Sequence, residues 1–282
     1  MCLSEAKGMD IIMENKLPTI GFLGSGAITT ALVTGLCERA ADAPYPLVVS
    51  DAKAEACEKL RARFPGRVTA AATLQECVDQ SDWIVIAVWP QAGEEVVRSL
   101  TFRPEQKIIN VMFDKTAEQV ASWMNCTPDT IIHMIPGTYL TFYPGPIVMC
   151  PSCPEAAEIF GRIGKIVNVE SRYQAAVFGT VTSLFAPLFS VMDHVIDWAA
   201  SEGVPEETAT AYVTSMFAAV CQEACGKNRG EVHYMATVST PGGINMQALE
   251  LLGKAGAFEA WPEVLKPIMV RTAGDIPKPS AH

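Results

Sequence analysis

Three small residues near the start of the chain, Gly24, Ser25 and Gly26, could bind a phosphate group. They follow a short apolar segment, residues 18–23, and precede a segment with helical periodicity, residues 27–40. Backbone amides at a helix N-terminus favour negative charge, and glycine lets the backbone approach a pyrophosphate closely. The sequence therefore predicts a dinucleotide site, although a plain glycine turn is the alternative. Our candidates for this site are Gly24, Ser25, Gly26, Ala27 and Ile28.

A second group of polar residues, Ser50, Asp51 and Lys53, lies at the end of the next predicted strand. A carboxylate there can accept hydrogen bonds from the ribose 2′-hydroxyl of NAD, and it would repel the 2′-phosphate of NADP. Ser50 and Lys53 could instead bind that phosphate. Both coenzymes therefore stay open, with a slight preference for NAD. Asp51 could also serve only to cap the helix that follows.

The elements that must position these residues alternate between strand and helix in the first part of the chain. Apolar runs such as residues 83–88 and 107–112 are typical of strands buried on both faces of a parallel sheet. The alternation stops near residue 170, and the rest of the chain is helical almost throughout. We predict an α/β fold with a flexible leader (1–17), a Rossmann-type doubly wound parallel sheet (18–169) and an all-helical substrate and dimerisation domain (170–282).

The first helical segment of the second part, residues 173–201, is uncharged as far as Asp193. A helix that is apolar on most sides must be covered by more than one neighbour. A second copy of the chain could supply part of that cover. We therefore expect a homodimer formed through the helical domains, with the site near the seam between them.

Composition narrows the classes of function. A formal net charge of −10 over 282 residues disfavours nucleic acid as a partner. We expect no membrane partner, because we count no charge-free apolar run of about 18 residues and no signal peptide. Nine scattered cysteines, an odd number, indicate reduced thiols in a cytoplasmic protein. Cys150 and Cys153 form a lone CxxC pair, so we predict no metal site.

Four motifs resemble those of the pyrroline-5-carboxylate reductase family, and the similarity runs along most of the chain. Residues 21–26 (GFLGSG) resemble the family's GFIGxG, and residues 87–91 (AVWPQ) resemble its AVKPQ. Residues 135–139 (IPGTY) stand where the family has MPNTP, and residues 239–245 (STPGGIN) match its TSPGGTT. The resemblance implies NAD(P)H-dependent reduction of a C=N bond, in pyrroline-5-carboxylate or another cyclic imine. It also implies that coenzyme contacts come from Val88, Trp89 and Pro90.

The chain departs from the family pattern where substrate would bind. Trp89 replaces a lysine, and Gly137 replaces an asparagine that lies near the nicotinamide in the family. The family's SGSGPAY segment, which helps to hold the substrate carboxylate, falls on residues 181–187, where only Ser183 and Ala186 match. The scaffold and coenzyme site thus carry over better than the substrate site. A divergent relative that reduces another imine is an open alternative.

Reduction of a C=N bond does not require a strongly acidic side chain, because an iminium is already activated by its own proton. A hydroxyl or a water molecule can hold or deliver that proton. The histidine nearest the predicted coenzyme edge, His133, could donate a proton near neutral pH or be a hydrogen-bonded strand residue. Each hydroxyl could instead cap a helix or close a turn. Our catalytic candidates are Thr240, Ser183 and His133. Our substrate-binding candidates are Thr138, Thr182, Ser183, Thr240, Gly242, Gly243 and Asn245.

Three other functions are open alternatives. β-Hydroxyacid dehydrogenases share the two-part layout, but they use a lysine in the first long helix of the second part, and this chain has none between Lys165 and Lys227. Prephenate dehydrogenases carry HPMxG where residues 133–137 read HMIPG, with the proline displaced. A non-catalytic nucleotide sensor would explain the loss of the substrate motif. Oxidation of NAD(P)H with any cyclic imine would separate an enzyme from a sensor.

Overall fold

The computed structural model describes residues 17–238, 240–274 and 276–279, so the predicted leader lies almost wholly outside the described residues, as does Ser239. The chain divides into two compact units, residues 1–175 and 176–282. We describe each unit by itself.

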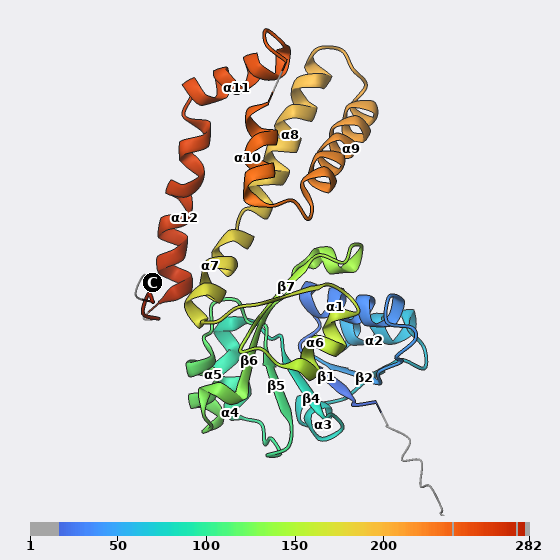
Figure 1. Cartoon of the computed structure of the whole chain (residues 1–282). Coiled ribbons are helices and arrows are strands. Elements are labelled where there is room, and N and C mark those ends of the chain that lie inside the picture. Colours follow the sequence, from blue (N-terminus) through green and yellow to red (C-terminus); the bar gives the residue numbers. More distant parts are fainter. Residues whose placement is uncertain (1–16, 239, 275, 280–282) are drawn as a thin grey trace, which may run out of the picture. The chain divides into compact units, whose positions relative to one another are not determined.

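The first unit contains an eight-stranded sheet in the order β3-β2-β1-β4-β5-β6-β7-β8 (Figure 1). Its strands are β1 (Ile20–Leu23), β2 (Leu47–Ser50), β3 (Val68–Ala70), β4 (Trp83–Ile86), β5 (Lys107–Asn110), β6 (Ile131–Ile135), β7 (Pro146–Cys150) and β8 (Lys165–Asn168). All neighbouring strands are parallel except β6 and β7. The predicted doubly wound sheet is confirmed, apart from this one antiparallel pair. The pair is antiparallel because the connection from β6 to β7 contains only a short 3-10 helix, η3 (Thr138–Thr141), whereas a parallel crossover needs a dozen residues or more.

Helices cover both faces of the sheet because successive side chains of each strand point to opposite faces. Ile20 and Phe22 of β1 pack on one face with residues of α1 (Ala27–Glu38), α2 (Ala54–Arg63) and α6 (Pro154–Gly161). Leu23 packs on the other face with residues of α3 (Leu74–Asp79), α4 (Gly93–Arg98) and α5 (Ala117–Met124). The carboxyl ends of the parallel strands are left for loops. In an open sheet of this kind, ligands bind in the crevice at that edge, where the strand order reverses.

The second unit is helical, as predicted. Helix α7 (Arg172–Thr182) contains the boundary, and it is followed by α8 (Phe185–Ser201), α9 (Glu206–Ala224), α10 (Arg229–Thr237), α11 (Ile244–Lys254) and α12 (Ala257–Ala273). Many large apolar side chains of this unit are exposed, among them Phe189, Trp198 and Tyr212 at 68%, 63% and 70%.

The single long helix expected over residues 173–201 is instead two helices, interrupted at Ser183 and Leu184. The amide of Ser183 donates to Thr180 and that of Leu184 to Val181, which closes tight turns at the end of α7. Pro187 has no N–H to donate to the carbonyl of Ser183, so an unbroken helix would leave that carbonyl unpaired.

Residues 172–201 together are long and apolar enough to cross a membrane by length and composition, with a mean hydropathy of 1.7 over an 18-residue window. The expectation that the chain lacks such an apolar run is therefore wrong. A core helix of a soluble protein passes the same test, so the run itself is weak evidence for a membrane.

Candidate active site

Gly24 forms a tight turn against the end of β4. Its φ of +105° lies in the region that side chains other than glycine rarely adopt. A Cβ atom at this position would lie 2.4 Å from the carbonyl oxygen of Ala87. The amide of Gly24 also donates to the carbonyl of Ser50 at 2.7 Å. The turn is thus held between the ends of β2 and β4, and only glycine fits it.

Gly26 leaves the N-terminus of α1 open. It is the N-cap residue, no side chain caps the helix, and the first turn contains no acidic residue. Gly26 and Ala27 are exposed, and a Cβ atom at Gly26 would meet nothing within 4 Å. Free amides and the helix dipole at such an end stabilise an anion. The glycine turn therefore fits the pyrophosphate of a dinucleotide.

Thr29 stands where the usual fingerprint has its third small residue. Its side chain is fully buried, and its hydroxyl donates to the carbonyl of Gly24 at 2.8 Å. A buried hydroxyl without a partner would be costly, so this bond explains how threonine is tolerated here. It also fixes the carbonyl of Gly24 and with it the shape of the turn.

Asp51 is joined directly to the glycine turn. Its Oδ2 atom accepts hydrogen bonds from the amide of Ser25 at 2.7 Å and from its hydroxyl at 2.9 Å, while Oδ1 accepts from the amide of Lys53 at 2.8 Å. Burial alone would raise the pKa of the Asp51 carboxyl, but these hydrogen bonds outweigh it and lower the pKa below its ordinary value. Asp51 is therefore a charged acceptor beside the turn.

The other two polar residues after β2 differ in exposure. Ser50 is only 1% exposed, and its hydroxyl is buried without a hydrogen-bond partner among the described residues. The carbonyl of Ser50 supports Gly24, and its role in the coenzyme site stays a prediction. The side chain of Lys53 is exposed, at the N-cap of α2.

The segment after β4 runs alongside the glycine turn. Val88 is partly buried against the core, and Pro90 begins the 3-10 helix η1 (Pro90–Ala92). Trp89, which caps that helix, is 79% exposed. A large aromatic side chain in place of the family's lysine thus faces solvent at the carboxyl edge.

His133 does not suit the role of proton donor. It lies in the middle of β6, where its Nδ1 atom is 3.1 Å from Nδ2 of Asn110, an amide that can only donate. Loss of hydration around the ring lowers its pKa to about 4; Glu118 opposes this shift, and Arg172 adds to it. The ring is therefore neutral near pH 7, and the structure favours the alternative, a hydrogen-bonded strand histidine.

Gly137 and Thr138 begin the connection after β6. A Cβ atom at Gly137 would lie 2.1 Å from the ring of Tyr139, so the family's asparagine cannot be accommodated without moving that ring. Thr138 is exposed at the start of η3. Of the two residues, Thr138 therefore offers an accessible hydroxyl.

The remaining hydroxyl candidates lie in the second unit. Thr182 and Ser183 donate to carbonyls three residues earlier, Gly179 and Thr180, at 2.6 and 2.7 Å. Thr240 is exposed in the turn before α11, whose N-cap Gly243 has no side-chain cap. Gly242, with a φ of +74°, and the exposed Asn245 lie in the same segment.

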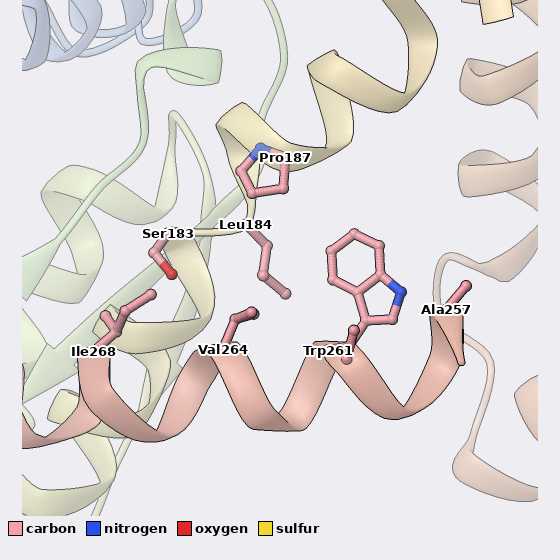
Figure 2. A pocket seen from close by; sticks show the side chains of 8 residues that line it. Ser183, Leu184, Pro187, Ala257, Trp261, Val264 and Ile268 are labelled. Atoms are coloured by element: carbon pink, nitrogen blue, oxygen red, sulfur yellow. The ribbon is translucent and has the colours of Figure 1, made fainter. Parts of the chain in front are cut away.

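Ser183 also borders a cavity of about 340 Å³ between the α7–α8 junction and α12 (Figure 2). The hydroxyl of Ser183 is the one side-chain oxygen on its wall, and the other lining residues are Leu184, Pro187, Ala257, Ala260, Trp261, Val264 and Ile268. The segment where the family pattern places a carboxylate site therefore adjoins an apolar surface.

Sequence reasoning did not single out three exposed aromatic residues at the carboxyl edge of the sheet, Phe113, Phe142 and Tyr143. A signal was available for Phe113, which directly follows the predicted strand over residues 107–112, whereas Phe142 and Tyr143 lie beyond η3 in the connection from β6 to β7. An aromatic side chain after a strand can equally be buried, so only the structure distinguishes the two cases.

Comparison with known proteins covers both units. Residues 19–113 match the family model described as NADP oxidoreductase coenzyme F420-dependent. Residues 171–273 match the model for pyrroline-5-carboxylate reductase dimerisation. Pyrroline-5-carboxylate reductase from Methanosarcina acetivorans is 26% identical over 262 residues, covering 88% of this chain and 94% of that protein. The enzyme from Glycine max is 25% identical over 253 residues, covering 84% and 89%.

The chain is thus similar to pyrroline-5-carboxylate reductases along most of its length, and its second unit matches their dimerisation model. Solved structures agree with this family's fold. The pyrroline-5-carboxylate reductase of Streptococcus pyogenes has a TM-score of 0.77 at 17% identity, covering 91% of this chain and 98% of that one. The Plasmodium falciparum enzyme, solved with NADP bound, has a TM-score of 0.75 at 15% identity, covering 91% and 97%. A reductive aminase from Aspergillus terreus has a TM-score of 0.55 at 15% identity, covering 90% of each chain.

Proposed function

We propose that this chain is an NAD(P)H-dependent oxidoreductase of the pyrroline-5-carboxylate reductase family that reduces the C=N bond of a small cyclic imine. The observation that carries the proposal is the glycine turn at the open N-terminus of α1. It lies at the sheet edge where dinucleotides bind in Rossmann-type folds. Relatives named pyrroline-5-carboxylate reductase match nearly the whole chain.

The chain's own groups would bind the coenzyme and orient the substrate. The amides at Gly26, Ala27 and Ile28 would hold the pyrophosphate, and the segment Val88–Pro90 would flank it. When bound, the reduced coenzyme would supply a hydride to the imine carbon, and the C=N π electrons would become the lone pair of the protonated nitrogen. Thr240 and Ser183 offer hydroxyls that could hold a proton or water at that nitrogen.

We further propose NADH as the preferred coenzyme. The Asp51 carboxylate lies beside the turn and is held in its charged form by three hydrogen bonds. It can accept hydrogen bonds from a ribose 2′-hydroxyl, whereas a 2′-phosphate would meet like charge. The exposed Lys53 is the chain's remaining candidate to offset that repulsion, since Ser50 is buried.

The working unit we propose is a cytoplasmic homodimer built through the helical domains. The described part of the second unit exposes large apolar side chains, and residues 171–273 match a dimerisation model. A second copy is the cover that best suits the apolar run of α7 and α8. The eight described cysteines are free, which suits a reducing compartment. A small molecule is the proposed substrate, and neither nucleic acid nor membrane is a proposed partner.

The activity is tested by mixing the purified full chain with NADH or NADPH and a panel of cyclic imines, including 1-pyrroline-5-carboxylate, and following coenzyme absorbance. We expect oxidation of NADH that depends on the imine, with amine formed in equal amount. Coenzyme binding without turnover of any imine would contradict the enzyme and favour a nucleotide sensor.

A further inference from the structure

The exposed large hydrophobic residues of the first unit are confined to one edge of the sheet. Over the described residues up to 175, they are Trp89, Phe113, Phe142 and Tyr143, at 79%, 39%, 88% and 51% exposure. All four are aromatic, and they follow the carboxyl ends of β4, β5 and β6. We call this set the aromatic edge. Confinement to one edge indicates a binding surface, because large apolar side chains scattered at random would not gather there.

Trp89 and Phe113 lie at equivalent positions after two neighbouring strands, β4 and β5. In the parallel pair of β4 and β5, Ile86 lies opposite Asn110, and the amide of Val111 continues the pairing by donating to Ile86. Trp89 and Phe113 each follow three residues after this matched pair. Adjacent strands are about 4.8 Å apart, so the two aromatic residues begin from adjoining points of the edge.

The backbone that carries Phe113 is fixed from inside the sheet. Asn110 is fully buried; its Oδ1 atom accepts from the amide of Met112 at 3.0 Å, and its Nδ2 atom donates to the carbonyl of Lys115 at 2.7 Å. These bonds close the loop on either side of Phe113. A loop held in this way offers its aromatic ring at a defined place, with little entropy left to lose on binding.

Trp89 adjoins the glycine turn. A Cβ atom at Gly24 would lie within 3.1 Å of the Val88 amide nitrogen, so the residue before Trp89 is already in contact with the turn. The turn ends β1, which lies between β2 and β4, where the strand order reverses. Ligands of open α/β sheets bind in that crevice. Trp89, one member of the aromatic edge, is thus beside the proposed coenzyme.

We propose that the aromatic edge binds a flat apolar ring of the substrate, so that the preferred substrate is a cyclic imine fused to or bearing an aromatic ring. This inference rests on the proposed function and specifies its substrate class. Aromatic side chains stack on flat rings with favourable geometry, whereas the lysine that Trp89 replaces in the family pattern would favour an anionic group.

Two imines of equal imine-ring size provide the test. In 3,4-dihydroisoquinoline a benzene ring is fused to the six-membered imine ring, and 2,3,4,5-tetrahydropyridine lacks the benzene ring. We expect the wild-type chain with NADH to have a kcat/KM at least about tenfold higher for 3,4-dihydroisoquinoline, and Trp89→Lys to remove most of that preference. Trp89→Leu keeps an apolar side chain and should lose less. Both variants are assayed at saturating NADH, because Trp89 also belongs to the segment proposed to flank the coenzyme.

Phe102→Leu is the matched control, because Phe102 is a partly buried aromatic residue that precedes β5, at the opposite edge of the sheet. It should leave the preference unchanged. Calorimetric titration of the NADH-loaded chain with each imine gives the same comparison without turnover, so failure of the reductase proposal is distinguishable from failure of this one.

Three results would overturn the inference. The first is a wild-type preference for tetrahydropyridine or 1-pyrroline-5-carboxylate. The second is an equal loss of kcat/KM for both imines in Trp89→Lys at saturating NADH, which would show that Trp89 does not distinguish the two substrates. The third is a change from dimer to monomer in Trp89→Lys by light scattering, which would make the aromatic edge an interface between copies.

Discussion

The carboxylate of Asp51 accepts a hydrogen bond from the backbone amide of Ser25 at 2.7 Å, which joins the acidic residue after β2 to the glycine turn after β1. The two features that the sequence places 26 residues apart are therefore one structural unit. In the function we propose, coenzyme choice and the shape of the glycine turn depend on the same side chain.

Replacing Asp51 should change coenzyme preference. Asp51→Asn removes the negative charge but keeps an acceptor oxygen for Ser25, so we expect NADH to bind roughly tenfold more weakly and NADPH more tightly. Isothermal titration with each coenzyme measures the change. Asp42→Asn, which breaks an ion pair with Arg162 away from the turn, is the control. Equal losses for both coenzymes in Asp51→Asn would argue against a role in choosing between them.

Gly24→Ala should lower the free energy of unfolding more than Gly66→Ala, because both glycines have a positive φ but only Gly24 has neighbours that a Cβ atom would meet. Gly24→Ala combines a strained φ of +105° with a contact at 2.4 Å from Ala87. Gly66→Ala has a φ of +77° with open space around the new Cβ, so it isolates the backbone strain, about 1–2 kcal/mol. Urea denaturation should show a clearly larger loss of unfolding free energy for Gly24→Ala. Similar losses for the two variants would mean that the turn is not held tightly against β4.

The buried bond from Thr29 to Gly24 should be needed for the turn. Thr29→Val keeps the volume but leaves the carbonyl of Gly24 unpaired, and we expect a loss of about 1–2 kcal/mol in unfolding free energy and weaker coenzyme binding. Thr29→Ser retains the hydroxyl and should restore most of the coenzyme affinity. If valine and serine behave alike in coenzyme titration, the hydroxyl has no such role.

His133 should affect acid stability rather than catalysis. Its folded-state pKa of about 4 lies below the ordinary value of 6.5, so between these values the unfolded chain binds the proton and the folded chain does not. The stability of the wild type should therefore fall as pH drops from about 6.5 towards 4, and it should be unaffected by this group above pH 7.

Urea denaturation at pH 7 and pH 5 tests this. From pH 7 to pH 5, the free energy of unfolding should fall less in His133→Gln than in the wild type. His233→Gln, on the exposed face of α10, should behave like the wild type. His133→Gln should also keep imine reduction within about threefold near pH 7.5. Loss of activity by two or more orders of magnitude, with the fold intact, would return His133 to the role of proton donor.

Sequence patterns were sufficient for the features that depend on local chemistry. The glycines before α1 indicate a tight turn, and the continuous apolar runs indicate buried strands, so the turn and the sheet were predictable. Features that depend on which face of a helix or strand is covered by other elements could not be predicted from the sequence. Ser50 and His133 lie at strand positions whose burial depends on how distant segments pack, and the break after Thr182 depends on Pro187 five residues later. The aromatic edge likewise needed the register of β4 and β5 to become visible.

The most direct test of the account is calorimetric titration of the full chain with NADH, in the wild type and in Gly26→Glu. Gly26→Glu places charge and bulk at the open N-terminus of α1, while Gly161→Glu, at the exposed end of α6, serves as the matched control. We predict binding in the wild type and in Gly161→Glu, and its loss in Gly26→Glu. Unchanged NADH affinity in Gly26→Glu would contradict the claim that the amides after β1 hold a pyrophosphate.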